Sequence, residues 1–215
     1  MYSAVVFDMD GVIFDSEKIY RKYQLEEGRK YGIPDDIMIR ICENIAGGTK
    51  ETNKTKFEEL SGTDIDYYVF REGVINSLDR HIEAHGVELK PGVLETLDFL
   101  KKNNIKIGLA TSTSKDRALG CLKKHDIVKY FDGMIFGDMV KKGKPNPDIY
   151  LTACDMIGAN PSQSIAVEDS INGIKSAHAA GMFPVMVIDL IQPTEEIQPY
   201  IYRIYDNMTQ IKELF

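Results

Sequence analysis

The sequence has few cysteines, no long apolar run and no excess of positive charge, and each of these features excludes a class of protein. Cys42, Cys121 and Cys154 form no C-x-x-C pair, which argues against a disulfide framework or a zinc site and fits a reduced cytosolic setting. No apolar stretch approaches the ~20 residues that a membrane helix needs. The apolar run at the amino terminus is broken by two aspartates and follows no basic segment, so we expect no signal peptide.

Charge and motif content narrow the possible functions further. The formal net charge is −7, which argues against binding to nucleic-acid backbones but allows a small anionic substrate held by local cations. Neither the glycine-rich P-loop motif nor the G-x-G-x-x-G dinucleotide motif is present in the sequence. With 215 residues, 43% hydrophobic and 27% charged, the composition is that of an ordinary globular protein. We expect a cytoplasmic monomer with no nucleic-acid or membrane partner.

Short apolar runs alternate with helical patterns along most of the chain. The runs are rich in β-branched or aromatic residues and lie at residues 3–8, 105–111, 133–136, 164–168, 184–188 and, more weakly, 201–205. Continuous apolar runs suit strands that are buried on both faces of a parallel sheet. Helical patterns separate most of them, at residues 92–103, 114–124, 147–157 and 171–180. The alternation predicts an α/β fold with a doubly wound parallel sheet.

The interval between residues 16 and 86 contains no strand candidate. Its helical patterns lie at residues 17–31, 35–44, 50–60 and 65–84, separated by turn residues. We therefore expect an all-helical insertion after the first strand. The α/β core would consist of residues 1–15 and 87–215, and the helical unit of residues 16–86. A single domain with a long helical excursion is the alternative.

Acids, hydroxyls and a lysine follow the predicted strands. They are Asp8, Asp10 and Gly11 after the first strand, Thr111 and Ser112 after the second, Lys144 shortly after the third, and Glu168, Asp169 and Ser170 after the fourth. Ligands of open parallel sheets bind beyond the carboxyl ends of the strands, so we expect these side chains to converge there. Each motif alone is better explained as a turn, a helix cap or a surface loop. Four such motifs in chain order make that explanation improbable.

These residue types fit phosphoryl transfer. Carboxylates can hold Mg²⁺, which prefers oxygen ligands, and the cation lets an anionic carboxylate approach an anionic phosphate. A lysine and a hydroxyl can bind the phosphoryl oxygens in the transition state. One carboxylate can act as the nucleophile, and a second can protonate the leaving oxygen and then activate water.

The same set of residues resembles the haloacid dehalogenase (HAD) superfamily of phosphohydrolases, and the resemblance covers essentially the whole chain. The runs FDMDGVIFDS (residues 7–16) and GKPNPD (residues 143–148) look most like the β-phosphoglucomutase-like subgroup. The resemblance implies a Rossmann-like core and a helical cap, inserted after the first strand, that sets specificity. It also implies Mg²⁺-dependent hydrolysis of a small phosphorylated metabolite through an aspartyl-phosphate intermediate. The substrate class that we favour is a sugar phosphate.

The resemblance also assigns roles to individual residues. It makes Asp8 the nucleophile and a metal ligand, and Asp10 the general acid/base, whose backbone carbonyl also binds Mg²⁺. Thr111 is the phosphate-binding hydroxyl, with Ser112 beside it, and Lys144 pairs with the phosphate and with the nucleophile.

The fourth motif departs from the pattern of many relatives. Asp169 is implied as a metal ligand, but the position four residues later, where many relatives carry another acid, is Gly173. By resemblance to the subgroup, Glu168 supplies the missing carboxylate to the metal, directly or through water.

Four residues of the helical insertion are candidates for substrate contact. Gly47 and Gly48 predict a flexible loop that can approach the active site, and Lys50 after them can reach an anionic part of the substrate. A solvated lysine at a helix start explains Lys50 equally well. Tyr20 lies on the first helix of the insertion. In β-phosphoglucomutases the resembling positions hold a histidine and an arginine in place of Tyr20 and Lys50, which weakens a mutase assignment.

The sequence thus favours a phosphatase but leaves other functions open. The second candidate is a sugar-phosphate mutase, in which the aspartyl-phosphate passes to another hydroxyl of the substrate. The third is a non-catalytic phospho-receiver module, which also uses carboxylates, a hydroxyl and a lysine on a parallel sheet. The length of this chain and its helical insertion favour an enzyme over a receiver. The fourth is an inactive relative used for binding, and the intact acids argue against it.

Overall fold

The computed structural model describes residues 2–45 and 49–215. The chain divides into two compact units. The first, here called the α/β unit, contains Met1–Asp15 and Glu88–Phe215, and the second, the helical unit, contains Ser16–Val87. No helix of the described residues has the length and apolar character that crossing a membrane requires.

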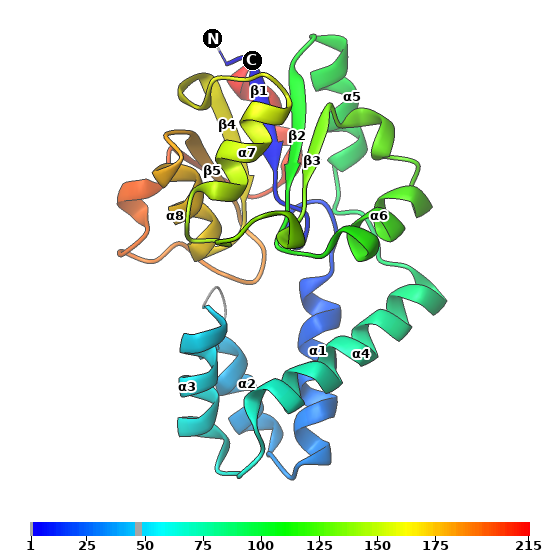
Figure 1. Ribbon diagram of the computed structural model, residues 1–215, viewed down its shortest axis with the longest axis vertical. Coiled ribbons are helices and arrows are strands. Elements are labelled where there is room, and N and C mark those ends of the chain that lie inside the picture. Colours follow the sequence, from blue (N-terminus) through cyan, green and yellow to red (C-terminus); the bar gives the residue numbers. More distant parts are fainter. Residues whose placement is uncertain (1, 46–48) are drawn as a thin grey trace. The chain divides into compact units, whose positions relative to one another are not determined.

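The α/β unit is built on a parallel sheet of six strands in the order β3-β2-β1-β4-β5-β6 (Figure 1). The strands are β1 (Ala4–Phe7), β2 (Lys106–Ala110), β3 (Gly133–Ile135), β4 (Ser164–Glu168), β5 (Phe183–Val187) and β6 (Arg203–Tyr205). Strands β1 and β4 are buried along their whole length, as their continuous apolar runs predict. The predicted doubly wound α/β fold is confirmed. The chain order reverses between β1 and β4, which marks the switch point where such sheets bind ligands.

Helices connect the strands of the α/β unit. They are α5 (Val93–Lys102), α6 (Lys115–Lys124), α7 (Asp148–Met156) and α8 (Ile171–Ala179), with short 3-10 helices at Val128–Tyr130, Gly137–Met139, Pro161–Gln163, Gln198–Tyr200 and Met208–Leu214. Helix α7 crosses in front of the sheet in Figure 1. Its Tyr150 and Ala153, together with Ala177 of α8, form one apolar cluster with Val6 and Ala110 of the sheet. These contacts pack α7 and α8 against strands β1 and β2.

The helical unit contains α1 (Glu17–Lys30), α2 (Asp35–Ile45), α3 (Lys50–Ser61) and α4 (Tyr67–His85). Its described residues form helices and no strand. The Phe57 ring packs against Phe70 and Tyr67, with centroid separations of 4.6 and 5.6 Å, inside the unit's own apolar core. Helix α4 begins at Tyr67 and not at residue 65, because the Asp66 side chain caps the helix by accepting from the backbone N–H of Tyr68.

Strands β1, β2 and β3 are one residue shorter at one or both ends than their apolar runs, and the last two strands differ from the expected ranges as well. Strand β5 begins at Phe183 and ends at Val187, one residue earlier at each end than the apolar run suggests. Strand β6 spans only Arg203–Tyr205, because the backbone before it forms a 3-10 turn in which the Ile201 N–H donates to the Gln198 carbonyl.

Candidate active site

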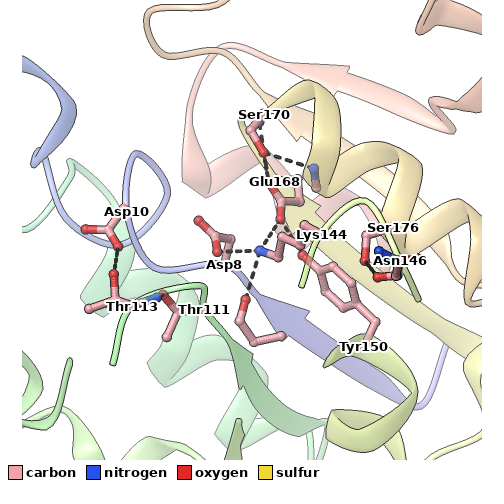
Figure 2. Close-up of polar contacts among 12 residues, drawn as sticks. Asp8, Asp10, Thr111, Thr113, Lys144, Asn146, Tyr150, Glu168, Ser170 and Ser176 are labelled. Carbon is pink, nitrogen blue, oxygen red and sulfur yellow. Dashed lines mark hydrogen bonds and ion pairs between the residues drawn. The ribbon is translucent and has the colours of Figure 1, made fainter. Parts of the chain in front are cut away.

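The motif residues of the α/β unit gather where strands β1, β2 and β4 end (Figure 2). Asp8 directly follows β1, and its backbone N–H donates to the Val167 carbonyl of β4 at 2.9 Å. Thr111 follows β2, and Glu168 is the last residue of β4. Their convergence follows from parallel pairing, which brings the carboxyl ends of neighbouring strands to one edge.

Lys144 lies at the centre of this group. Its ammonium donates to Asp8 Oδ1 at 2.5 Å, to Glu168 Oε1 at 2.5 Å and to the Ala110 carbonyl at 3.0 Å. The side chain is only 7% exposed. Burial disfavours the charged amine, but the two carboxylates outweigh burial and raise the pKa of Lys144. The lysine is therefore a fixed positive charge beside Asp8.

Two hydrogen bonds hold the loop that carries Lys144. The Asn146 side chain donates to the Gly143 carbonyl at 3.0 Å, which closes the turn. The hydroxyl of Ser176, on α8, donates to the Asn146 carbonyl at 2.6 Å (Figure 2). The second bond ties the Lys144 loop, which lies between β3 and β4 in the sequence, to helix α8.

Asp8 is buried, with an exposed fraction of 7%. Burial raises the pKa of its carboxyl to about 8, Lys144 opposes this rise, and the charges of Glu168 and Asp10 add to it. A carboxylate at this position therefore needs more positive charge than one lysine supplies. A bound cation would meet that need.

Three buried carboxylates of the described residues can hold such a cation. Ligand oxygens of Asp8, Glu168 and Asp169 lie within 4.8 Å of one another. A site built from oxygen atoms alone suits Mg²⁺. Asp169 lies against the backbone of Gly11, where an added Cβ would meet Asp169 Oδ2 at 2.1 Å. Gly11 also has a positive φ of 79°, so two independent constraints favour glycine there.

Glu168 occupies the space beside Gly173 on α8. A Cβ at Gly173 would lie 1.9–2.0 Å from the Glu168 carboxyl group. The small residue where many relatives carry an acid thus leaves room for the carboxylate of Glu168.

Two contacts to Glu168 could not be read from the motifs. The Tyr150 hydroxyl donates to Glu168 Oε1 at 2.6 Å, and the Ser170 hydroxyl donates to Glu168 Oε2 at 2.9 Å. Burial and the charge of Glu168 raise the pKa of Tyr150, so its hydroxyl keeps the proton that it donates. The helical pattern of residues 147–157 indicates a buried tyrosine, and nothing in the sequence shows which carboxylate it meets.

Asp10 lies on the other side of Asp8, at the start of the loop that follows β1. Its Oδ2 accepts a hydrogen bond of 2.7 Å from the Thr113 hydroxyl, another contact that the motifs do not reveal. Thr111 is fully buried, and its Oγ1 accepts from the Thr113 N–H at 3.0 Å. Ser112, between them, is exposed. The phosphate-binding roles of Thr111 and Ser112 stay predictions.

The candidates in the helical unit are placed only in part. Gly47 and Gly48 lie outside the described residues. Lys50 is the first residue of α3 and is exposed, and Tyr20 on α1 packs against the apolar core of the helical unit. Burial raises the pKa of Tyr20. The substrate-binding roles of these four residues stay predictions.

Comparison with known proteins gives a consistent family. The model of the family described as "Haloacid dehalogenase-like hydrolase" matches residues 5–187. A phosphorylated carbohydrates phosphatase of Thermotoga maritima is 36% identical over 83% of this chain and 82% of its own length. A beta-phosphoglucomutase of Bacillus subtilis is 34% identical over 86% of this chain and 82% of its own. The crystal structure of beta-phosphoglucomutase from Clostridium difficile aligns with a TM-score of 0.73 and 25% identity over 98% of this chain and 93% of that chain.

Proposed function

The chain belongs to the haloacid dehalogenase-like hydrolase family, and we propose that it is a Mg²⁺-dependent phosphatase of small phosphorylated metabolites, sugar phosphates in particular. The observation that carries the proposal is the buried pair of the Lys144 ammonium and the Asp8 carboxylate, beside Asp169 at the edge of the sheet. This arrangement combines a nucleophile, a cation for phosphoryl oxygens and a metal-binding acid.

In the first half of the proposed reaction, an Asp8 oxygen attacks phosphorus and the bond from phosphorus to the leaving oxygen breaks. The Lys144 ammonium binds phosphoryl oxygens and stabilises their charge in the transition state. Asp10, in its protonated form, gives its proton to the leaving oxygen, so that the product leaves as an alcohol. The hydrogen bond from Thr113 orients the Asp10 carboxyl group.

In the second half, Asp10 takes a proton from a water molecule, whose oxygen attacks phosphorus. The bond from phosphorus to Asp8 breaks, inorganic phosphate leaves and the Asp8 carboxylate is restored. The buried carboxylates of Asp8 and Asp169 would hold a Mg²⁺ ion, which would neutralise charge between nucleophile and phosphate.

The proposal is tested with the purified protein, Mg²⁺ and a panel of phosphate esters, by measuring the release of inorganic phosphate. We expect the highest kcat/KM among sugar phosphates. Release of no phosphate from any sugar phosphate or from p-nitrophenyl phosphate would contradict the proposal.

A sugar-phosphate mutase is the second candidate, because one relative that covers most of this chain is named beta-phosphoglucomutase. The chemistry at Asp8 is the same, and the acceptor is a sugar hydroxyl in place of water. Incubation with β-glucose 1-phosphate separates the two functions. A phosphatase releases inorganic phosphate, whereas a mutase forms glucose 6-phosphate without phosphate release.

We also propose that the helical unit, Ser16–Val87, selects the substrate. The carboxylates and the lysine with a role in the reaction come from the α/β unit. Selection by a separate unit would allow the same chemistry to act on different esters. Lys50, which follows the Gly47-Gly48 pair in the sequence, is our candidate in this unit for contact with an anionic part of the substrate.

A further inference from the structure

Tyr150 is a buried residue for which the reaction has no direct use. It lies on α7, is fully buried and packs in the apolar cluster that includes Ala110 and Ile135. Its hydroxyl nevertheless points out of this cluster to the Glu168 carboxylate (Figure 2). A polar atom inside an apolar cluster costs stability unless it is bonded, so the single partner is informative.

The carboxylate of Glu168 is already saturated with hydrogen bonds. Its Oε1 accepts from Lys144 Nζ at 2.5 Å and from the Tyr150 hydroxyl at 2.6 Å. Its Oε2 accepts from the Ser170 hydroxyl at 2.9 Å and from the Ser170 N–H at 3.3 Å. An ionised carboxylate offers about four acceptor positions. The protein itself fills all of them, which leaves little capacity for a metal ion.

Tyr150 contacts both partners of the Lys144–Glu168 pair. Its hydroxyl bonds Glu168, and Lys144 Nζ lies 5.1 Å from the centroid of its ring, within the range of a cation–π contact. The tyrosine therefore fixes where the ammonium and its second carboxylate meet. If Glu168 were free to turn away, Lys144 would pair with Asp8 alone.

We propose that Tyr150 is a positioning residue that, with Ser170, holds Glu168 as the fixed counter-ion of Lys144, so that Asp8 and Asp169 are the carboxylates that bind the metal. The inference rests on the proposed phosphatase function of this site. Glu168 then acts on the nucleophile through the lysine and not through the metal.

The central variant is Tyr150→Phe, which keeps the ring and removes the hydroxyl. We expect its kcat on p-nitrophenyl phosphate to fall by roughly 10–100-fold, as for the loss of other supporting partners of active-site groups. We expect its Mg²⁺ dissociation constant, measured by isothermal titration calorimetry, to equal that of the wild type. Tyr130→Phe is the matched control, because the Tyr130 hydroxyl also donates to a carboxylate, that of Asp98, at 2.7 Å on the surface. This control should keep both values.

A double-mutant cycle separates positioning from a general loss of packing. If Tyr150 acts through Glu168, the variant carrying both Tyr150→Phe and Glu168→Gln should be no slower than Glu168→Gln alone. Independent, multiplying losses would overturn the proposal. Retention of full activity by Tyr150→Phe would also overturn it.

Calorimetry with Mg²⁺ alone tests the ligand assignment without any reaction. Asp169→Asn should weaken Mg²⁺ binding, whereas Glu168→Gln and Tyr150→Phe should not. Weakening by Glu168→Gln to the same extent as by Asp169→Asn would make Glu168 a metal ligand and overturn the proposal. A wild-type protein that binds Mg²⁺ but hydrolyses no ester would instead contradict the proposed function, and the binding data would still decide the role of Glu168.

Discussion

As the proposed nucleophile, Asp8 has to meet two opposing requirements. A nucleophile in phosphoryl transfer works in a dry site, yet burial raises the pKa of this carboxyl to about 8 and so disfavours its reactive form. Lys144 offsets part of that cost, at an Nζ–Oδ1 distance of 2.5 Å. The proposed Mg²⁺ ion would offset the remainder. Nucleophile, lysine and cation are therefore one electrostatic unit, in which the loss of one member alters the others.

Replacement of Asp8 by asparagine should abolish turnover. The amide has nearly the same size, but it is a far poorer nucleophile and carries no charge for the metal or for Lys144. Release of phosphate from sugar phosphates measures the effect, and a thermal melt checks that the variant is folded. The control is Asp155→Asn, on the exposed side of α7, which should be fully active. Near wild-type activity of the Asp8 variant would place the nucleophile elsewhere.

Replacement of Asp10 by asparagine should slow hydrolysis by about 10²–10⁴-fold, the usual contribution of general acid–base catalysis. The loss should be smaller for p-nitrophenyl phosphate, whose leaving group needs no proton, than for a sugar phosphate. The measurement is kcat/KM for both esters with wild type and variant. Equal losses on the two esters would indicate a structural or metal-binding role for Asp10.

The residues of the site differed in how far sequence could predict them. Asp8 and Lys144 were recognisable because four motifs of acids, hydroxyls and a lysine follow the strands in chain order, although each motif alone has a structural explanation. Tyr150 was not, because a tyrosine in an apolar helical pattern is usually part of a core. Its partner Glu168 lies 18 residues away, and only the packing of α7 against the sheet brings the two together. Such contacts depend on tertiary structure, which no local pattern encodes.

At the scale of elements, the sequence predicted the bounds of the buried strand β4 more closely than those of the edge strand β6. Strand β4 matches its predicted range, and all five of its residues are buried. Strand β6 lies at the edge of the sheet, where Arg203 and Ile204 are exposed and only Tyr205 is buried. An edge strand carries a weaker hydrophobic pattern, so its start could not be predicted.

Two helical glycines should respond oppositely to replacement by alanine. Gly120 on α6 has open space at the Cβ position, so Gly120→Ala should stabilise the protein by about 0.5–1 kcal/mol through helix propensity. Gly173→Ala should destabilise it and lower activity, because its Cβ would collide with the Glu168 carboxyl group. Thermal unfolding and kcat for both variants check this. Stabilisation by Gly173→Ala with full activity would show that Glu168 can move without consequence.

At the scale of the whole molecule, the proposed division of labour between the two units can be tested through Lys50. The variant Lys50→Ala should lower kcat/KM on the best sugar phosphate much more than on p-nitrophenyl phosphate. Binding energy from the part of the substrate that does not react contributes to catalysis, and the small ester offers little of it. Lys54→Ala, one turn later on the exposed surface of α3, is the matched control. Equal losses on both esters would argue against a role of Lys50 in selection.

Metal binding should be coupled to protonation and to the stability of the folded chain. In the metal-free protein burial raises the pKa of Asp8 from 3.8 to about 8, so a proton competes for this carboxylate near neutral pH. Mg²⁺ needs the carboxylate and must expel this proton. Its apparent affinity should therefore rise by up to about tenfold per pH unit below pH 8 and level off above it.

The same shift fixes the sign of the effect on stability. A raised pKa means that the folded metal-free chain favours the protonated acid, and this contribution to stability is fully present below pH 3.8 and is lost as the pH rises through about 8. Bound Mg²⁺ favours the carboxylate and reverses the trend. The increase in Tm on adding Mg²⁺ should therefore grow as the pH rises toward 8. Calorimetric titrations with Mg²⁺ in buffers of different ionisation enthalpy measure the number of protons that binding releases. We expect up to one proton for the wild type and none for Asp8→Asn. A Mg²⁺ affinity that does not change with pH below pH 8 would contradict the coupling.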